Sequence, residues 1–249
     1  MTSSDWRAFL EQFSRDLLAD ERIRDGLPDA VIESGWMGFE PASVAQIVAL
    51  ETRLGVRLPP SYRTFLGVTN GWRATGPFIH RLWSTDDVTW FRERHQDWID
   101  AYVEPWREMI QDLNGEELDD RENPEHLQTA LELSDVGDSA IYLLIPGRVT
   151  SEGEWEAWDF ANWHPGAVRH PSFAELMQSA RDGLVSLRQS QAENPGAHQI
   201  EQPPAFQWGP EQQQIVQRVR EIMMSESPSD PELQKLVNQL LGGQGKSAD

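Results

Sequence analysis

The sequence contains no cysteine. Disulfide bonds, thiolate zinc sites, iron–sulfur clusters and cysteine nucleophiles are therefore excluded, and a reducing compartment fits this composition. Long apolar runs are also missing, so no segment is expected to cross a bilayer. The first residues lack the basic-then-apolar pattern of a secretory signal. We therefore expect a cytoplasmic protein with no attachment to a membrane.

Basic residues are scarce. The 249 residues include 21 Lys and Arg against 41 Asp and Glu, which gives a formal net charge of -20 at pH 7. A field of this sign repels phosphates, so it disfavours nucleic acids and anionic membranes and favours a basic protein as the partner. Acidity also keeps proteins soluble, so charge alone does not decide the function.

The common signatures of catalysis are missing as well. No metalloprotease, nucleophile-elbow, Walker or dinucleotide-binding motif occurs. His164 and His170, near Asp159, lack a standard spacing for metal ligands, so surface histidines are favoured over a metal site. Asp135 and Asp138 precede a strand and fit turn chemistry better than acid and base catalysis. We expect no cofactor and no metal, and an enzyme is only the third interpretation.

What the sequence does contain is enough apolar and aromatic residues for a core, with 39% hydrophobic residues and 11 Trp. The first predicted element is an amphipathic helix that begins after Ser3 or Ser4 as a possible cap. Its apolar side chains recur at the period of a helix, and they are Trp6, Phe9, Leu10, Phe13 and Leu17.

Two further helices have clear start and stop signals. Ser43 and Gln46 form a capping box, and the apolar stripe that follows ends at Gly55. The proline pair at 59–60 suits the first turn of the second helix. Asn70-Gly71 is expected to end that helix, because both residues tolerate a positive φ.

The middle of the chain is predicted to alternate between strand and helix. Apolar alternation predicts a strand over 78–83. The polar run at 84–87 is expected to open a helix that reaches about residue 113 and carries Val88, Phe91, Trp98 and Tyr102. The acidic stretch at 114–125 is expected to be a solvated loop.

Three short strands and a closing helix are predicted next. The strands lie near 131–133, 141–145 and 155–160, and the last two resemble an antiparallel hairpin. Ser172 and Glu175 form a capping box for the closing helix. The fold class is therefore α+β, with a small, mostly antiparallel or mixed sheet packed by helices.

We expect four segments along the chain. They are an N-terminal helix at 1–25, a principal domain at 26–190, a linker rich in Gln, Pro and Gly at 191–210, and a C-terminal helical tail at 211–249.

One passage of the principal domain resembles the signature of the SUKH superfamily, which includes a fungal regulator of cell-wall synthesis. The residues that carry this resemblance are Ile47, Leu50, Glu51, Leu54, Gly55, Leu58, Pro59, Tyr62, Phe65, Leu66, Asn70 and Gly71. Gly137-Asp138 before a strand and Ser172-Phe173 at the last helix resemble the later half of the family. The resemblance spans roughly residues 30–190, and the two ends of the chain depart from it.

The resemblance implies a mixed sheet packed by helices, in which the motif residues build the scaffold. It also implies a non-enzymatic protein-binding module, because bacterial SUKH proteins are mostly immunity proteins of polymorphic toxin systems. We expect an immunity protein that neutralises a basic, nuclease-type toxin by covering its active site. A regulatory scaffold in signalling or cell-wall control, with the C-terminal tail recruiting a second partner, is the alternative.

The surface that meets the partner is expected to combine an aromatic anchor with carboxylates. Trp72, after the Asn-Gly turn, is the aromatic candidate for exposure. The carboxylates are expected on one face of the long helix and on the hairpin, and the candidates are Asp86, Asp87, Glu93, Asp97, Glu152, Glu154 and Glu156. Asp100, Glu104 and Glu108 extend the helical set.

Overall fold

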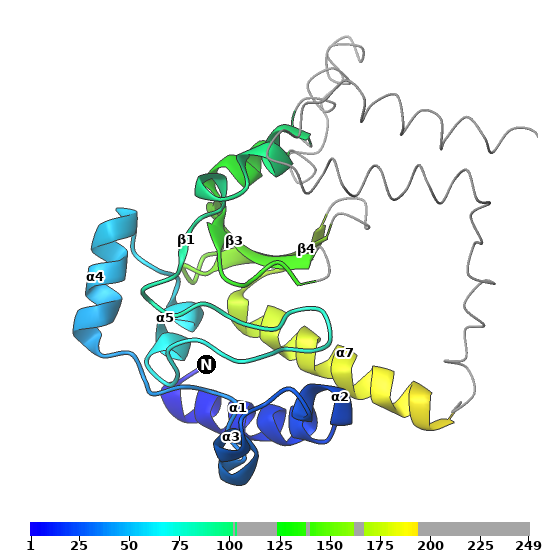
Figure 1. Cartoon of the computed structure of the whole chain (residues 1–249). Helices are drawn as coiled ribbons and strands as arrows, with labels where there is room; N and C mark the ends of the chain where they lie inside the picture. Colours follow the sequence, from blue (N-terminus) through cyan, green and yellow to red (C-terminus); the bar gives the residue numbers. More distant parts are fainter. Residues whose placement is uncertain (102, 104–123, 138–139, 162–166, 194–249) are drawn as a thin grey trace, which may run out of the picture. The chain divides into compact units, whose positions relative to one another are not determined.

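The computed structural model describes residues 1–101, 103, 124–137, 140–161 and 167–193 (Figure 1). Its helices are α1 (Ser3–Leu18), α2 (Glu21–Arg24), α3 (Asp29–Ser34), α4 (Val44–Leu54), α5 (Pro60–Leu66), α7 (Phe173–Glu193) and the 3₁₀ helices η1 (Phe91–Glu93) and η3 (Pro124–Thr129). Its strands are β1 (Thr89–Trp90), β2 (Leu131–Glu132), β3 (Ala140–Val149), β4 (Trp155–Ala161) and β5 (Ala167–His170).

The five strands form one sheet in the order β1-β2-β3-β4-β5, and every neighbouring pair is antiparallel. The α+β prediction is thereby confirmed, as are the three expected strands. β3 and β4 pair from Ala140 opposite Ala161 to Ile145 opposite Glu156. Their turn contains Gly153 at a φ of 79°, a conformation that glycine adopts without strain. β1 and β5 were not predicted.

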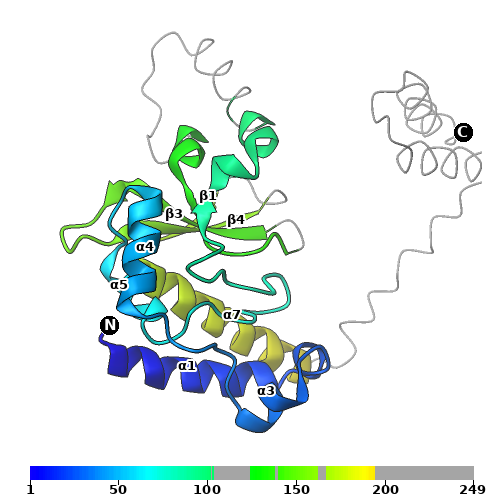
Figure 2. The ribbon, with the colours of Figure 1, turned by 60° about the vertical axis from the view of Figure 1, so that its left-hand side comes forward.

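Both faces of the sheet are covered. In β3, Tyr142 and Leu144 belong to a core cluster shared with α1, α5 and α7. Ile141 and Leu143 point the other way, into a second cluster with Phe91 and the neighbourhood of η3. Figures 1 and 2 show the sheet between these two layers. Because successive strand residues face opposite sides, double coverage explains the uninterrupted apolar run at 141–145.

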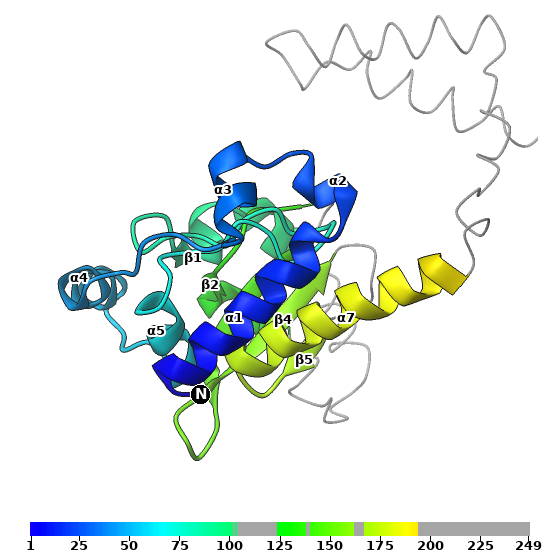
Figure 3. The same cartoon turned by 90° about the horizontal axis from the view of Figure 1, so that it is seen from below.

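Helix α1 is part of the main core. Trp6, Leu10, Phe13 and Leu17 are all 0% exposed. Figures 2 and 3 show α1 beside α7, to which it is joined by an ion pair between Asp16 Oδ2 and Arg181 Nε at 2.6 Å.

The cap of α1 differs slightly from the prediction. Thr2, rather than Ser3 or Ser4, caps the helix and forms a capping box with Asp5.

The two ends of α4 lie where the local sequence signals predict them. The capping box of Ser43 and Gln46 is present, and Gly55 ends α4 in the left-handed conformation, as predicted. Glu51 then joins the two helices, because its Oε1 accepts from the backbone N–H of Leu58 at 3.1 Å and from Arg63 Nε at 3.2 Å.

Helix α5 packs deeply but ends early. Tyr62, Phe65 and Leu66 are at most 1% exposed. The expected end at Asn70-Gly71 is wrong, because α5 stops at Leu66. Asn70-Gly71 instead forms a separate corner, in which Asn70 Oδ1 accepts from the backbone N–H of Thr85 at 2.8 Å.

The strand predicted over 78–83 is also wrong. Only Leu82 pairs there, through isolated bridges to Trp72 and Ser134. Residues 75–79, which overlap the start of this segment, form a loop closed by the bond from Thr75 N to Ile79 O at 3.1 Å.

Several predictions lie outside the described residues. They are the later part of the helix expected to reach residue 113, most of the acidic loop at 114–125, and the tail at 211–249. Helix α7 continues to Glu193, just inside the predicted linker, and the remainder of the linker is likewise outside. Among the described helices, none combines the length and the apolar character needed to cross a membrane.

Candidate functional site

The candidate site is the segment 84–100, which carries Asp86, Asp87, Glu93 and Asp97, four of the carboxylates expected to meet a partner. It also carries Asp100, which extends that set and is exposed. The prediction that a helix begins at Ser84 is wrong. Ser84 and Asp87 form a turn, in which the Ser84 hydroxyl donates to Asp87 Oδ2 at 2.6 Å, and α-helical conformation begins only at residue 96. Thr89 and Trp90 pair with β2 instead, because tertiary pairing overrides a local helix signal.

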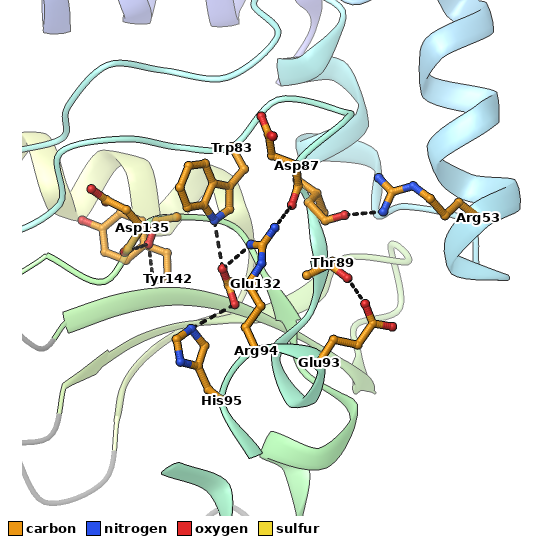
Figure 4. A network of polar contacts seen from close by, with 12 residues as sticks. Arg53, Trp83, Asp87, Thr89, Glu93, Arg94, His95, Glu132, Asp135 and Tyr142 are labelled. Atoms are coloured by element: carbon orange, nitrogen blue, oxygen red, sulfur yellow. Dashed lines mark hydrogen bonds and ion pairs between the residues drawn. The ribbon is translucent and has the colours of Figure 1, made fainter. Parts of the chain in front are cut away.

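A buried carboxylate supports this segment (Figure 4). Glu132 in β2 is 1% exposed. Its Oε1 accepts from Trp83 Nε1 at 3.0 Å and from Arg94 Nη1 at 2.6 Å. His95 Nε2 lies 3.3 Å from Oε2, but without the alignment of a hydrogen bond, so Oε2 has no hydrogen-bond partner among the described residues. A buried carboxylate is stable only with compensating donors, and Arg94 supplies the countercharge.

Two arginines fix the backbone above this carboxylate. Arg94 Nη2 donates to the carbonyl oxygen of Asp87 at 2.7 Å. Arg53, from α4, donates to the carbonyl oxygens of Val88 at 2.8 Å and Thr85 at 2.7 Å. Figure 4 shows Arg53 and Arg94 reaching the 85–89 stretch from different elements. Hydrogen bonds from a charged donor are stronger than neutral ones, so this stretch is held in one conformation.

The four carboxylates do not share one helical face, and their predicted alignment is wrong. Asp86 lies in the turn, Glu93 ends η1 and Asp97 lies in the following helix, and all three are exposed. Asp87 is half-buried against Ser84. Glu93 also accepts a hydrogen bond from the Thr89 hydroxyl. Glu104 and Glu108 lie outside the described residues.

Trp72 is not an exposed anchor. It is 0% exposed, and its ring lies 6.1 Å from that of Phe13 and 5.3 Å from that of Trp36 between centroids. The expectation of exposure is wrong because the chain turns inward after Gly71, where the backbone of Trp72 pairs with Leu82. Three other tryptophans, Trp83, Trp90 and Trp98, are half-buried against the two core clusters.

The hairpin carboxylates have different environments. Glu154 accepts from the backbone N–H of Ser61 at 2.9 Å and from its hydroxyl at 2.6 Å, so it caps the start of α5. Glu156 pairs with Arg148 at 3.0 Å and accepts from Trp158 Nε1 at 2.6 Å. Glu152 is exposed, and a hydrogen bond from Ser151 lowers its pKa.

Three of the histidines and aspartates that were candidates for a metal site or for acid and base catalysis lie among the described residues, namely Asp135, Asp159 and His170. No group of three or more His, Cys, Asp or Glu in the described ranges could hold a metal ion. Asp135 Oδ1 accepts from the backbone N–H groups of His80 and Arg81, at 3.2 and 3.1 Å. His170 is half-buried, and burial lowers its pKa. Asp138 and His164 lie outside the described residues.

Sequence reasoning missed the network that organises the site. Glu132 is an isolated carboxylate between Leu131 and Leu133 in a strand that the apolar pattern predicts to be buried. That position was a usable signal, because buried charges are paired. Its partners Arg94 and Trp83 had no such signal, since they become neighbours only through the fold.

Comparison with known families identifies the chain. The model of the SMI1 / KNR4 family (SUKH-1) matches residues 41–179. The chain belongs to this family. The region that matches the SMI1/KNR4 family contains α4, α5, the whole sheet and the first part of α7, whereas α1, α2 and α3 precede it. No curated protein matches the chain.

The SMI1/KNR4 match also includes the candidate site. Arg53, Arg94 and Glu132 all lie between residues 41 and 179. SMI1/KNR4 membership is compatible with an immunity-type or a regulatory protein, and it leaves the partner to be identified.

Proposed function

We propose that the chain is a non-enzymatic protein-binding module, an immunity protein that neutralises a basic, nuclease-type toxin domain by covering its active site. The observation that best supports this proposal is the acidic surface of segment 84–100, whose backbone is fixed by hydrogen bonds from two arginines. Asp86, Glu93 and Asp97 are exposed there, and Arg53 and Arg94 fix the backbone on either side of Asp86.

The physical basis is electrostatic attraction to a prepared surface. A net charge of -20 accelerates encounter with a cationic partner at low salt. Nucleic-acid-directed toxins carry basic substrate clefts, so a counter-charged protein can occupy such a cleft without any chemistry. A surface that is already ordered loses little conformational entropy on binding.

The first test measures association with a basic toxin domain encoded beside this chain, at increasing salt. We expect the association rate constant to fall steeply as salt rises, because screening removes the steering. The variant Asp86→Lys should slow association, whereas the control Glu33→Lys makes the same charge change on α3, where Glu33 is exposed. A rate that is insensitive to salt, or equal effects of both variants, would count against the proposal.

A second test addresses the ordering of the surface. Arg53→Ala removes both bonds to the 85–88 backbone, so it should weaken toxin binding about tenfold through lost preorganisation. Arg57→Ala removes an exposed arginine for which no hydrogen bond or ion pair is found among the described residues, and it should bind normally. Growth rescue on co-expression with the toxin should follow the same order.

The alternative is a regulatory scaffold in signalling or cell-wall control. The sequence of the C-terminal tail favours it, because the apolar residues Leu233, Leu236, Val237 and Leu240 recur at helical spacing. Deleting residues 195–249 separates the two functions. Toxin protection that survives the deletion shows that the tail is dispensable, and loss of a host partner without any toxin binding would favour the scaffold.

A further inference from the structure

A cavity of about 410 Å³ opens between the 75–79 loop, the β3–β5 part of the sheet and α7. Its wall is mainly apolar and includes Ile79, Leu176 and Leu184. At its margin, Phe78 and Val168 are 47% and 46% exposed. Small-molecule sites are concave, mostly apolar and of a few hundred cubic ångströms, so the cavity has the size of a ligand site.

Small residues of α7 keep this space open. Ser179, Ala180 and Gly183 line the cavity from consecutive turns of the helix. Gly183 lies well inside a helix of 21 residues, where glycine is a poor helix former. A Cβ added at Gly183 would meet nothing within 4 Å. Neither close packing nor a left-handed backbone therefore requires glycine here, and its visible effect is to leave the cavity wide.

The wall also offers a hydrogen-bond donor from a pair of hydroxyl groups. The hydroxyl groups of Thr75 and Tyr142 lie 3.1 Å apart and share a hydrogen bond. Two hydroxyl groups carry two protons and their mutual bond uses one, so the other proton can be donated to a ligand. Burial raises the pKa of Tyr142, which keeps the phenol protonated. Burial also lowers the pKa of His170 in the same wall, which favours the neutral form of this ring.

We propose that this cavity binds a small uncharged molecule with an apolar body and one hydrogen-bond acceptor, which the Thr75–Tyr142 hydroxyl pair recognises. Two charge observations argue against an anionic ligand. Asp159 lines the cavity, and the chain as a whole carries -20. None of the residues that line the cavity belongs to segment 84–100, so this proposal does not rest on the proposed toxin binding.

The test uses prodan, a neutral naphthalene ketone whose emission shifts to the blue in an apolar site, titrated into the full chain. We expect saturable binding of one prodan per chain, and much weaker binding of the anionic fluorophore anilinonaphthalene sulfonate. Gly183→Leu fills the cavity and should weaken prodan binding at least about tenfold. Ser186→Leu adds the same side chain at an exposed position of α7 and should bind like the wild type.

Tyr142→Phe provides a second measurement in case Gly183→Leu fails to fold. It keeps the ring and removes one hydroxyl, and it should weaken prodan binding about threefold to tenfold, the size expected for one hydrogen bond. The proposal is overturned if a folded Gly183→Leu chain binds prodan normally, or if Tyr142→Phe leaves the affinity unchanged. Absence of blue-shifted emission from the wild-type chain also overturns it, and a protein side chain would then be the better occupant.

Discussion

Arg94 Nη1 lies 2.6 Å from Oε1 of Glu132, a carboxylate that is 1% exposed in β2. The same guanidinium donates to the carbonyl oxygen of Asp87. One arginine therefore both balances the buried charge and holds the acidic turn, so the core and the candidate surface share a support.

The first prediction concerns this shared support. Glu132→Ala leaves Arg94 and Trp83 Nε1 without their acceptor, and it should lower the free energy of unfolding by about 2–4 kcal/mol. Urea denaturation measures the loss. Glu152→Ala removes an exposed carboxylate and should change stability by less than about 0.5 kcal/mol. Equal losses in the two variants would contradict the structural role of Glu132.

The second prediction is that Phe65→Ala is a folding variant. Phe65 is 0% exposed, and its ring lies 5.4 Å from that of Trp6 and 5.0 Å from that of Phe173 between centroids. Truncating such a side chain should lower the free energy of unfolding by about 3–5 kcal/mol. Phe78→Ala, at a ring that is 47% exposed, is the matched control and should lose much less. Unchanged stability of Phe65→Ala in a chemical melt would show that this position does not support the core.

Gly71 gives a third prediction, because its backbone has a φ of 97°. A Cβ there would lie 2.8 Å from the carbonyl oxygen of Leu82. Gly71→Ala should therefore lower the thermal midpoint and cost about 1–3 kcal/mol. Gly76→Ala meets nothing within 4 Å and should be within about 0.5 kcal/mol of the wild type. If both substitutions are tolerated equally, the corner is not constrained as described.

The fourth prediction is a loss of stability at alkaline pH. Burial raises the pKa of both Tyr62 and Tyr142 above the ordinary tyrosine value of about 10. The unfolded chain then releases these protons at lower pH than the folded chain does. Stability is fully present below pH 10 and falls as the pH rises above it, by up to about 1.4 kcal/mol per pH unit for each tyrosine.

Tyr62→Phe separates the contribution of one ring. The Tyr62 hydroxyl is buried and makes no hydrogen bond within the described part of the chain, so its removal should be neutral or stabilising near pH 7. It should also reduce the alkaline slope of the unfolding free energy, measured by urea denaturation at several pH values. A slope identical to that of the wild type would exclude Tyr62 as a source.

Local signals predicted those elements whose ends are encoded nearby. Ser43 with Gln46 and Gly55 set both ends of α4 through contacts within a few residues. The apolar run of β3 and the apolar residues of β4 on either side of Glu156 and Asp159 are sufficient for both to be recognised as strands. β1 could not be found in this way, since two residues between a turn and a 3₁₀ helix become a strand only by pairing with β2.

Of the candidate site, only its acidic character was predicted from the sequence. Exposure of Asp86, Glu93 and Asp97 follows from their polarity, but the placement of Asp86 depends on Arg53 and Arg94, which act across the fold. The prediction that Trp72 is exposed is wrong for a related reason. The residue after a tight turn can point either way, and here the partners Phe13 and Trp36, far away in sequence, draw it inward.

Helix α1 changes what should be regarded as the folding unit. The family match begins at residue 41, yet α1 supplies Trp6, whose indole N–H donates to the carbonyl oxygen of Ser61 at 3.1 Å. A fragment cut at the family boundary would expose the apolar surface that α1 shields and would be prone to aggregate. Chimaeras with other SMI1/KNR4 proteins should therefore exchange residues 1–193 as a block.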